Sequence, residues 1–322
     1  MRIVFSGSIA YDYLMTFPGY FKDHILPDEL DSLSLSFLTD SMTRQRGGTA
    51  ANSAYSYALL QGKGTVLGTA GHDFSKYRAD LDSVGVDTSG IVEIADEFTA
   101  SFFANTDLSN AQIASFYPGA MAHAAQLELS DLPFTPDLVV ISPDDPGAMR
   151  ARVCECHELN IPYLYDPSQQ IVSLEPKDLY EGVIGAKMIL TNAYEFSLIK
   201  KKLGLDEEGI TDKCAVVGIT HGKLGAVILA QGTRSETPAF PTENVRDPTG
   251  AGDAFRGGFL RGVALDLSWE MCGLVGALAA TYCLEQVGTQ NHSYTPPAFV
   301  ERFRTHFDDE GVLDMLLEQN ND

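Results

Sequence analysis

Short runs rich in β-branched residues alternate with longer runs rich in alanine and leucine along most of this 322-residue chain. The alternation is typical of βαβ units around a largely parallel sheet. We expect strands at residues 2–5, 138–141, 188–191 and 215–220. From apolar spacings of three and four, we expect helices at residues 50–61, 147–159, 253–264 and 269–285. Polar residues end or follow these strands, and ligand sites in open α/β sheets gather at such carboxyl ends.

Two segments interrupt this rhythm. Residues 97–118 alternate polar and apolar side chains on either side of a DLSN turn, which predicts a β-hairpin. Together with residues 13–46, this hairpin predicts a small β lid over the ligand-binding edge. The large α/β domain then consists of residues 1–12, 47–96 and 119–322. An ordinary extension of the main sheet is the alternative.

The charge excludes several classes of partner. The chain has 22 Lys and Arg against 44 Asp and Glu, a formal net charge of -22, so we expect neither nucleic acid nor membrane surfaces as partners. No apolar run reaches the length of a membrane helix, roughly 18 residues. Five cysteines without a C-x-x-C pair, and no secretory leader, indicate a cytoplasmic protein. The seven histidines lack the spacing of a transition-metal site.

The most informative segment is DPTGAGDAFRGGFLRG at residues 247–262. Gly250, Ala251 and Gly252 stand directly before the helix expected at Asp253. Glycines allow successive N–H groups to turn inward, and a helix N-terminus adds unpaired donors, so the segment predicts an anion site suited to phosphate. A plain tight turn with Asp253 as the helix cap is the alternative. Neither a Walker loop nor a G-x-G-x-x-G after the first strand occurs in the sequence.

A carboxylate beside a phosphate site suits the transfer of a phosphoryl group to a hydroxyl. Asp253 stands where it could accept the hydroxyl proton. The N–H groups of the turn at Gly250, Ala251 and Gly252 could stabilise the charge on the phosphoryl group as it moves. In a loose transition state the proton leaves late, so the low pKa of a carboxylate is no obstacle. The segment therefore predicts a kinase with Asp253 as its base.

These residues resemble the ribokinase (PfkB) family of carbohydrate and nucleoside kinases. The segment at 247–255 matches the family signature D-T-x-G-A-G-D except that Pro248 replaces Thr. Further segments follow in the family's order: GSIAYD at 7–12, RGGTAANSA at 46–54, TNAYE at 191–195 and THGKLGA at 220–226. The resemblance spans nearly the whole chain. It implies a ribokinase-like three-layer α/β/α domain with a mostly parallel sheet, a small β-sheet lid, and ATP as cosubstrate.

The resemblance also implies roles around the acceptor. Asp12 would accept hydrogen bonds from ribose or sugar hydroxyls, while Gly47, Gly48 and Asn52 would hold the same ring. A carboxylate suits two neighbouring hydroxyls, and glycine lets a polar ring approach the backbone. The alternatives are a turn residue at the end of a strand for Asp12 and a helix cap for Asn52.

For the nucleotide, the resemblance implies a second set of residues. Asn192 and Glu195 match the family's N-x-x-E motif, in which Glu195 would hold Mg²⁺ indirectly, through water. The alternative for Glu195 is an acid favoured by the helix dipole. Thr220, Gly222 and Gly225 would lie along the phosphates. Residues 287–294 correspond to the loop over adenine and to the K⁺ site of some members.

The acceptor itself is predicted from residues outside the shared motifs. Phe103 and Phe116 of the hairpin would stack on a purine, and Gln169 and Gln170 would meet a base edge. These features resemble bacterial adenosine kinases, so adenosine is the expected substrate. Other acceptors stay open: inosine, guanosine, cytidine, and a sugar as in ribokinases or fructokinases. A regulator that binds a nucleoside or sugar without catalysis is a further alternative. The chain is expected to be either a monomer or a homodimer formed through the lid. The two phenylalanines are alternatively hairpin core.

Overall fold

The computed structural model describes residues 1–25 and 34–318, so part of the segment 13–46 expected in the lid lies outside the described residues. Its main sheet has nine strands in the order β13-β12-β11-β10-β9-β8-β1-β4-β5. The strands from β11 to β5 in this order are parallel, and β12 and β13 are antiparallel. Their bounds are β1 Ile3–Ser6, β4 Gly64–Gly71, β5 Ile91–Ile94, β8 Leu138–Ile141, β9 Tyr163–Tyr165, β10 Met188–Asn192, β11 Val216–Thr220, β12 Ala226–Ala230 and β13 Thr233–Thr237.

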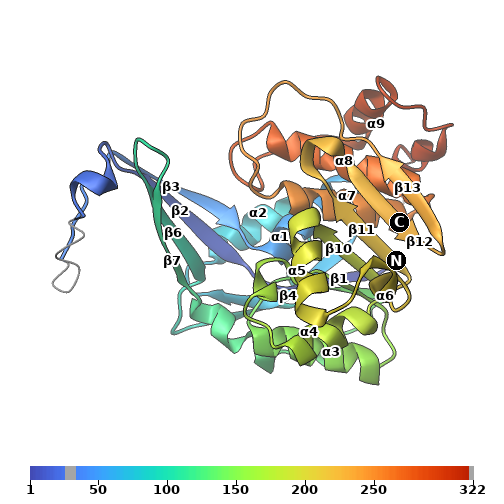
Figure 1. Cartoon of the computed structure of the whole chain (residues 1–322), viewed down its shortest axis with the longest axis horizontal. Coiled ribbons are helices and arrows are strands. Elements are labelled where there is room, and N and C mark those ends of the chain that lie inside the picture. Colours follow the sequence, from blue (N-terminus) through green and yellow to red (C-terminus); the bar gives the residue numbers. More distant parts are fainter. Residues whose placement is uncertain (26–33, 319–322) are drawn as a thin grey trace.

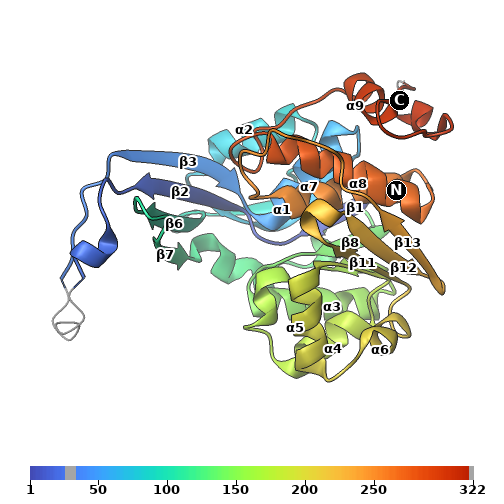
Figure 2. The same cartoon turned by 45° about the horizontal axis from the view of Figure 1, so that its top comes forward.

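Helices cover both faces of this sheet, which confirms the ribokinase-like three-layer prediction (Figure 2). Successive strand residues point to opposite faces. Phe5 therefore packs into one core, with helices α1 and α7, and Val4 packs into the other, with α3, α4 and α5. The helices are α1 Thr49–Leu59, α2 Ser75–Ser83, α3 Pro146–Glu158, α4 Pro176–Ile184, α5 Ala193–Leu203, α6 Glu207–Thr211, α7 Ala251–Ala264, α8 Trp269–Leu284 and α9 Pro296–Arg304.

A separate four-stranded sheet projects from one side of the molecule (Figure 1). Its order is β3-β2-β6-β7, with β2 Ala10–Thr16, β3 Ser41–Gly47, β6 Ala100–Thr106 and β7 Gln112–Tyr117. The hairpin expected at 97–118 is present as β6 and β7. Its turn is held by Asp107, whose Oδ1 accepts hydrogen bonds from the N–H groups of Ser109 and Ala111. This sheet is separate from the main one, so the alternative of a simple sheet extension is wrong.

Helix α7 is held between α1 and α8 by glycines that allow close backbone approach. A Cβ on Gly257 would lie 2.6 Å from the carbonyl oxygen of Ser53 in α1. A Cβ on Gly258 would lie 2.8 Å from the Cβ of Ala279 in α8. These two contacts fix where α7 begins, at the carboxyl edge of the main sheet.

We expect Gly257→Ala to lower the free energy of unfolding by about 2 kcal/mol, because overpacking against backbone outweighs the gain in helix propensity. Denaturant unfolding measures the change. The matched control is Gly252→Ala in the first turn of the same helix, where the added Cβ meets only Arg256 Nη2, at 4.0 Å. Equal stability of the two variants would contradict the account of this packing.

Candidate active site

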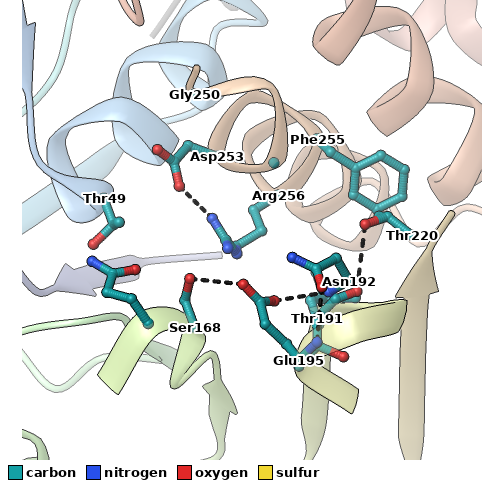
Figure 3. Close-up of a pocket in the computed structure, with 13 residues that line it drawn as sticks. Thr49, Ser168, Thr191, Asn192, Glu195, Thr220, Gly250, Asp253, Phe255 and Arg256 are labelled. Carbon is teal, nitrogen blue, oxygen red and sulfur yellow. Dashed lines mark hydrogen bonds and ion pairs between the residues drawn. The ribbon is translucent and has the colours of Figure 1, made fainter. Parts of the chain in front are cut away.

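Two adjoining cavities lie at the carboxyl ends of the parallel strands, and Thr49, Gln169, Gly250 and Asp253 line both of them. The first cavity lies among the N-termini of α7 and α5 and the ends of β10 and β11 (Figure 3). The second extends from Asp253 toward the small sheet. Asp253 therefore stands at the wall between them.

The start of α7 has the backbone geometry expected of the glycine-rich turn. Gly250 has φ +78°, and a Cβ there would lie 2.8 Å from the Cβ of Thr289. Ala251 begins the helix, and its N–H donates to the carbonyl of Pro248 at 3.3 Å. The N–H groups of Gly252 and Asp253 belong to the first turn, which has no intrahelical acceptors. Gly250 and Gly252 line the first cavity, so this turn faces it.

Asp253 is buried and both of its carboxylate oxygens accept hydrogen bonds. Asn52 Nδ2 donates to Oδ2 at 2.8 Å, and Arg256 Nη1 donates to Oδ1. Asn52 Oδ1 in turn accepts from Thr289 and Gln290, at 2.8 Å each. Burial raises the pKa of Asp253, and the charge of Arg256 and the amide of Asn52 oppose that rise. Asn52 lies within α1 rather than at its cap, and it holds Asp253 in place.

Asp12, on β2, lines the second cavity. Its pKa is raised to about 6, first by burial and then by the negative charges of Asp253 and Asp247. Gly47 lies against it, since a Cβ there would be 2.8 Å from Asp12 Oδ2. Gly48 has φ +94° and lines the cavity. The structure thus brings Asp12, Gly47, Gly48 and Asn52 together beside Asp253.

The small sheet contributes Phe102 and Phe116, which pair across β6 and β7, to the wall of the second cavity. The prediction of Phe103 at this position is corrected. Neighbouring strand residues point to opposite faces, and Phe103 stacks on Tyr13 with ring centroids 4.8 Å apart. Side chains alternate between the two faces along a strand, and directly paired residues share a face. Pairing with Phe116 therefore places Phe102, and not Phe103, on the cavity side.

Gln169 and Gln170 also line the second cavity. Gln170 Nε2 donates to the backbone carbonyl of Asp144 at 2.8 Å. Asp144 follows β8, lines the same cavity and was not among the predicted residues. Burial raises the pKa of Asp144 to about 7. The lining of the second cavity therefore offers amide and carboxyl groups as well as two aromatic rings.

Asn192 and Glu195 line the first cavity and form a reciprocal cap at the start of α5. Glu195 Oε2 accepts from the Asn192 N–H at 2.9 Å, and Asn192 Oδ1 accepts from the Glu195 N–H at 2.8 Å. Ser168 Oγ donates to Glu195 Oε1 at 3.0 Å (Figure 3). Glu195 is thus an acid in the first turn of α5 that caps the helix, and it also lines the first cavity.

The predicted nucleotide residues at the end of β11 and in the turn after it divide into two groups. Thr220 lines the first cavity. Gly222 and Gly225 lie in the following turn, outside both linings, with φ +56° and +96°. A Cβ on Gly225 would lie 2.0 Å from the carbonyl oxygen of Thr237, so packing against the end of β13 explains this glycine.

The fit of Mg²⁺ to this site depends on the donors present. Among the described residues, no group of three or more His, Cys, Asp and Glu is arranged to hold a metal ion. Glu195 and Asn192 instead offer isolated hard oxygens to the first cavity. Such donors suit an ion that keeps much of its water shell and is carried mainly by phosphate oxygens.

Arg256 and Asp166 are site residues that the sequence reasoning missed. Arg256 lines the first cavity one helical turn after Asp253, and its Nη2 lies 2.6 Å from Asp166 Oδ2. Asp166 directly follows β9 and is fully buried. The spacing of three between Asp253 and Arg256 on an expected helix was the available signal.

Comparisons with known proteins agree with this site. The model of the pfkB family of carbohydrate kinases matches residues 12–296. A curated nucleoside kinase of Methanothermobacter thermautotrophicus is 30% identical over 305 residues, which are 92% of this chain and 94% of that protein.

No helix among the described residues is both long enough and apolar enough to cross a membrane.

Solved structures extend the likeness to the fold. A Burkholderia thailandensis nucleoside kinase in its ligand-free form is 34% identical with TM-score 0.84, covering 94% of this chain and 100% of that one. The same protein in complex with inosine is 32% identical with TM-score 0.84, covering 95% and 98%. The Methanocaldococcus jannaschii nucleoside kinase is 27% identical with TM-score 0.85, covering 95% and 98%. The chain therefore belongs to the pfkB family of carbohydrate kinases, as an ATP-dependent phosphotransferase that acts on an alcohol acceptor.

Proposed function

We propose that this kinase transfers the γ-phosphoryl group of ATP to the 5′-hydroxyl of a nucleoside, with adenosine as the acceptor. The observation that carries the proposal is the place of Asp253, at the wall shared by two cavities and in the first turn of α7. The nucleoside would occupy the second cavity and the nucleotide phosphates the first. The similarity to nucleoside kinases over at least nine tenths of the chain supports this acceptor class.

In the proposed reaction Asp253 orients the 5′-hydroxyl and accepts its proton as the phosphoryl moves. The new bond joins the 5′-oxygen to the γ-phosphorus, and the bond to the β-γ bridging oxygen breaks, which leaves ADP. The N–H groups around Gly250, Ala251 and Gly252 stabilise charge on the transferring group. Asn52 and Arg256 hold Asp253 from two sides, which fixes the direction of its free lone pairs.

The ribose would lie against Asp12, Gly48 and Asn52, with Gly47 allowing Asp12 to stand close to the backbone. Phe102 and Phe116 would enclose the base, since stacking favours a purine over a bare sugar. Gln169, Gln170 and Asp144 would meet the base edge. Inosine is the second candidate, because the similar kinase of Burkholderia thailandensis has been solved in complex with inosine.

On the nucleotide side, Asn192, Glu195 and Thr220 would face the phosphates, and Gly222 and Gly225 would shape the turn beyond them. Bound Mg²⁺ supplies neutralisation of charge on the phosphate oxygens. Residues 13–46 and 97–118 would act as a lid that excludes water from the second cavity. A cytoplasmic location fits the five unpaired cysteines.

Replacing the proposed base tests its role directly. We expect Asp253→Asn to lower kcat by at least about 100-fold while the dissociation constant for the nucleoside changes little, because the proton acceptor is lost but the volume is kept. Coupled assays of ADP release and calorimetric titration measure the two quantities. Near-normal turnover would refute the assignment of Asp253.

Acceptor choice is tested by ADP release with MgATP and a panel of adenosine, inosine, guanosine, cytidine, ribose and fructose. We expect the highest kcat/KM with adenosine. We expect Phe102→Ala to raise the nucleoside KM by about 10-fold, given the roughly 1–3 kcal/mol of base stacking. Phe103→Ala, on the opposite face, is the matched control. A sugar preference, or equal effects of the two variants, would contradict the proposed acceptor site.

A further inference from the structure

Arg256, which lines the first cavity, joins two buried carboxylates. Figure 3 shows its contact with Asp253. Its Nη1 pairs with Asp253 in the first turn of α7, and its Nη2 lies 2.6 Å from Asp166 Oδ2 after β9. Arg256 has 7% of its surface exposed and Asp166 has none. The guanidinium thus links the helix that carries Asp253 to the carboxyl end of a central strand.

The surroundings of this bridge are strongly acidic. Among the described residues that line the two cavities, Arg256 is the only lysine or arginine. Both carboxylate oxygens of Asp166 are buried without a well-aligned hydrogen bond among the described residues, so the charge of Asp166 is balanced by its ion pair with Arg256, whose Nη2 lies 2.6 Å from Oδ2. Several titratable groups on the elements packed around Asp253 and its neighbour Asp12 interact electrostatically with one or both of them. They are Asp166, Glu195, Asp247, Arg256, Cys283 and Tyr77, besides the two aspartates themselves.

We propose that Arg256 is a positioning residue for phosphoryl transfer, which keeps Asp253 ionised and oriented, and that Asp166 determines how much of the guanidinium charge Asp253 receives. The inference rests on the proposed role of Asp253 but not on the identity of the acceptor. Neither Arg256 nor Asp166 needs to contact the nucleoside for this role.

Charge balance gives Arg256 this role. Without Arg256, two buried carboxylates face each other with no cation between them, and one of them takes up a proton. Even with Arg256 present the pKa of Asp166 is raised to about 7, chiefly by burial, and burial also raises the pKa of Asp253; in both groups the charge of Arg256 opposes the rise. A protonated Asp253 cannot accept the hydroxyl proton. If Arg256 is lost and residue 166 is also uncharged, Asp253 no longer faces a second negative charge. The repulsion that favours its protonation is then removed.

Four variants separate this role from others: Arg256→Met, Arg256→Lys, Asp166→Asn and the double variant Asp166→Asn/Arg256→Met. We expect Arg256→Met to lower kcat at pH 7 by about 100-fold, with a nucleoside KM within about threefold of the wild type. We expect Arg256→Lys to be intermediate. The double variant should recover about 10-fold of the kcat lost in Arg256→Met.

The pH dependence of kcat/KM gives a second readout. In Arg256→Met the acid limb should move to higher pH, because Asp253 loses its cation. In Asp166→Asn the limb should move to lower pH, because Arg256 then serves Asp253 alone and a like charge is gone. Circular dichroism and thermal unfolding establish that each variant is folded. Since Asp166→Asn keeps the cation, it provides the test even if Arg256→Met does not fold.

An unmoved acid limb in Asp166→Asn would overturn the proposal, as would a double variant no more active than Arg256→Met. A rise confined to the KM for ATP in Arg256→Met would also overturn it, since it would mean that Arg256 binds phosphate instead. A wild-type preference for a sugar would reject the proposed acceptor, not this bridge. The same profiles would then be measured with that sugar.

Discussion

The N-terminus of α7 must lie at the carboxyl edge of the parallel sheet, and much of the molecule is arranged to keep it there. Gly257 allows α1 to pack against α7 at backbone distance, and Gly258 does the same for α8. The positive φ of Gly250 then turns the chain so that the first-turn N–H groups face the cavity. Asp253, one residue beyond Gly252, is carried to the wall between the two cavities by the same geometry.

The net charge of -22 is compatible with a triphosphate because the two act on different scales. Net charge governs the attraction of extended charged surfaces such as nucleic acid. A bound nucleotide meets local groups: backbone N–H donors, a helix N-terminus and the single arginine among the described residues of the two linings. That arginine already pairs with both Asp166 and Asp253. Backbone N–H dipoles and a bound metal ion would therefore neutralise most of the negative charge of the phosphates.

The sequence allowed the layered fold and the position of α7 to be predicted, because both depend on local patterns. Alternating β-branched and helical runs place β1, β8, β10 and β11 within one or two residues of the expected ranges. The glycine turn was readable because positive φ and close approach require glycine. Phe103 was expected at the cavity that Phe102 lines, because neighbouring residues of a strand face opposite sides and an error of one position reverses the face.

Long-range pairings were the part that the sequence did not reveal. Asn52 and Asp253 are 201 residues apart, and no local pattern indicates that the amide holds the carboxylate. The bridge from Arg256 to Asp166 has the same character, since it depends on helix α7 meeting the carboxyl end of β9. Gly225 matched a family segment, yet its close contact with Thr237 accounts for the glycine. Sequence motifs therefore identified the reacting carboxylate better than the residues that hold it.

The central claim is that the first turn of α7 receives the transferring phosphoryl group. Gly252→Ala tests it most directly, because Gly252 lines the first cavity and the added Cβ touches nothing closer than Arg256 Nη2 at 4.0 Å. The account predicts a thermal unfolding temperature equal to or slightly above that of the wild type, with kcat lowered by about 100-fold. A stable variant with undiminished kcat would contradict it.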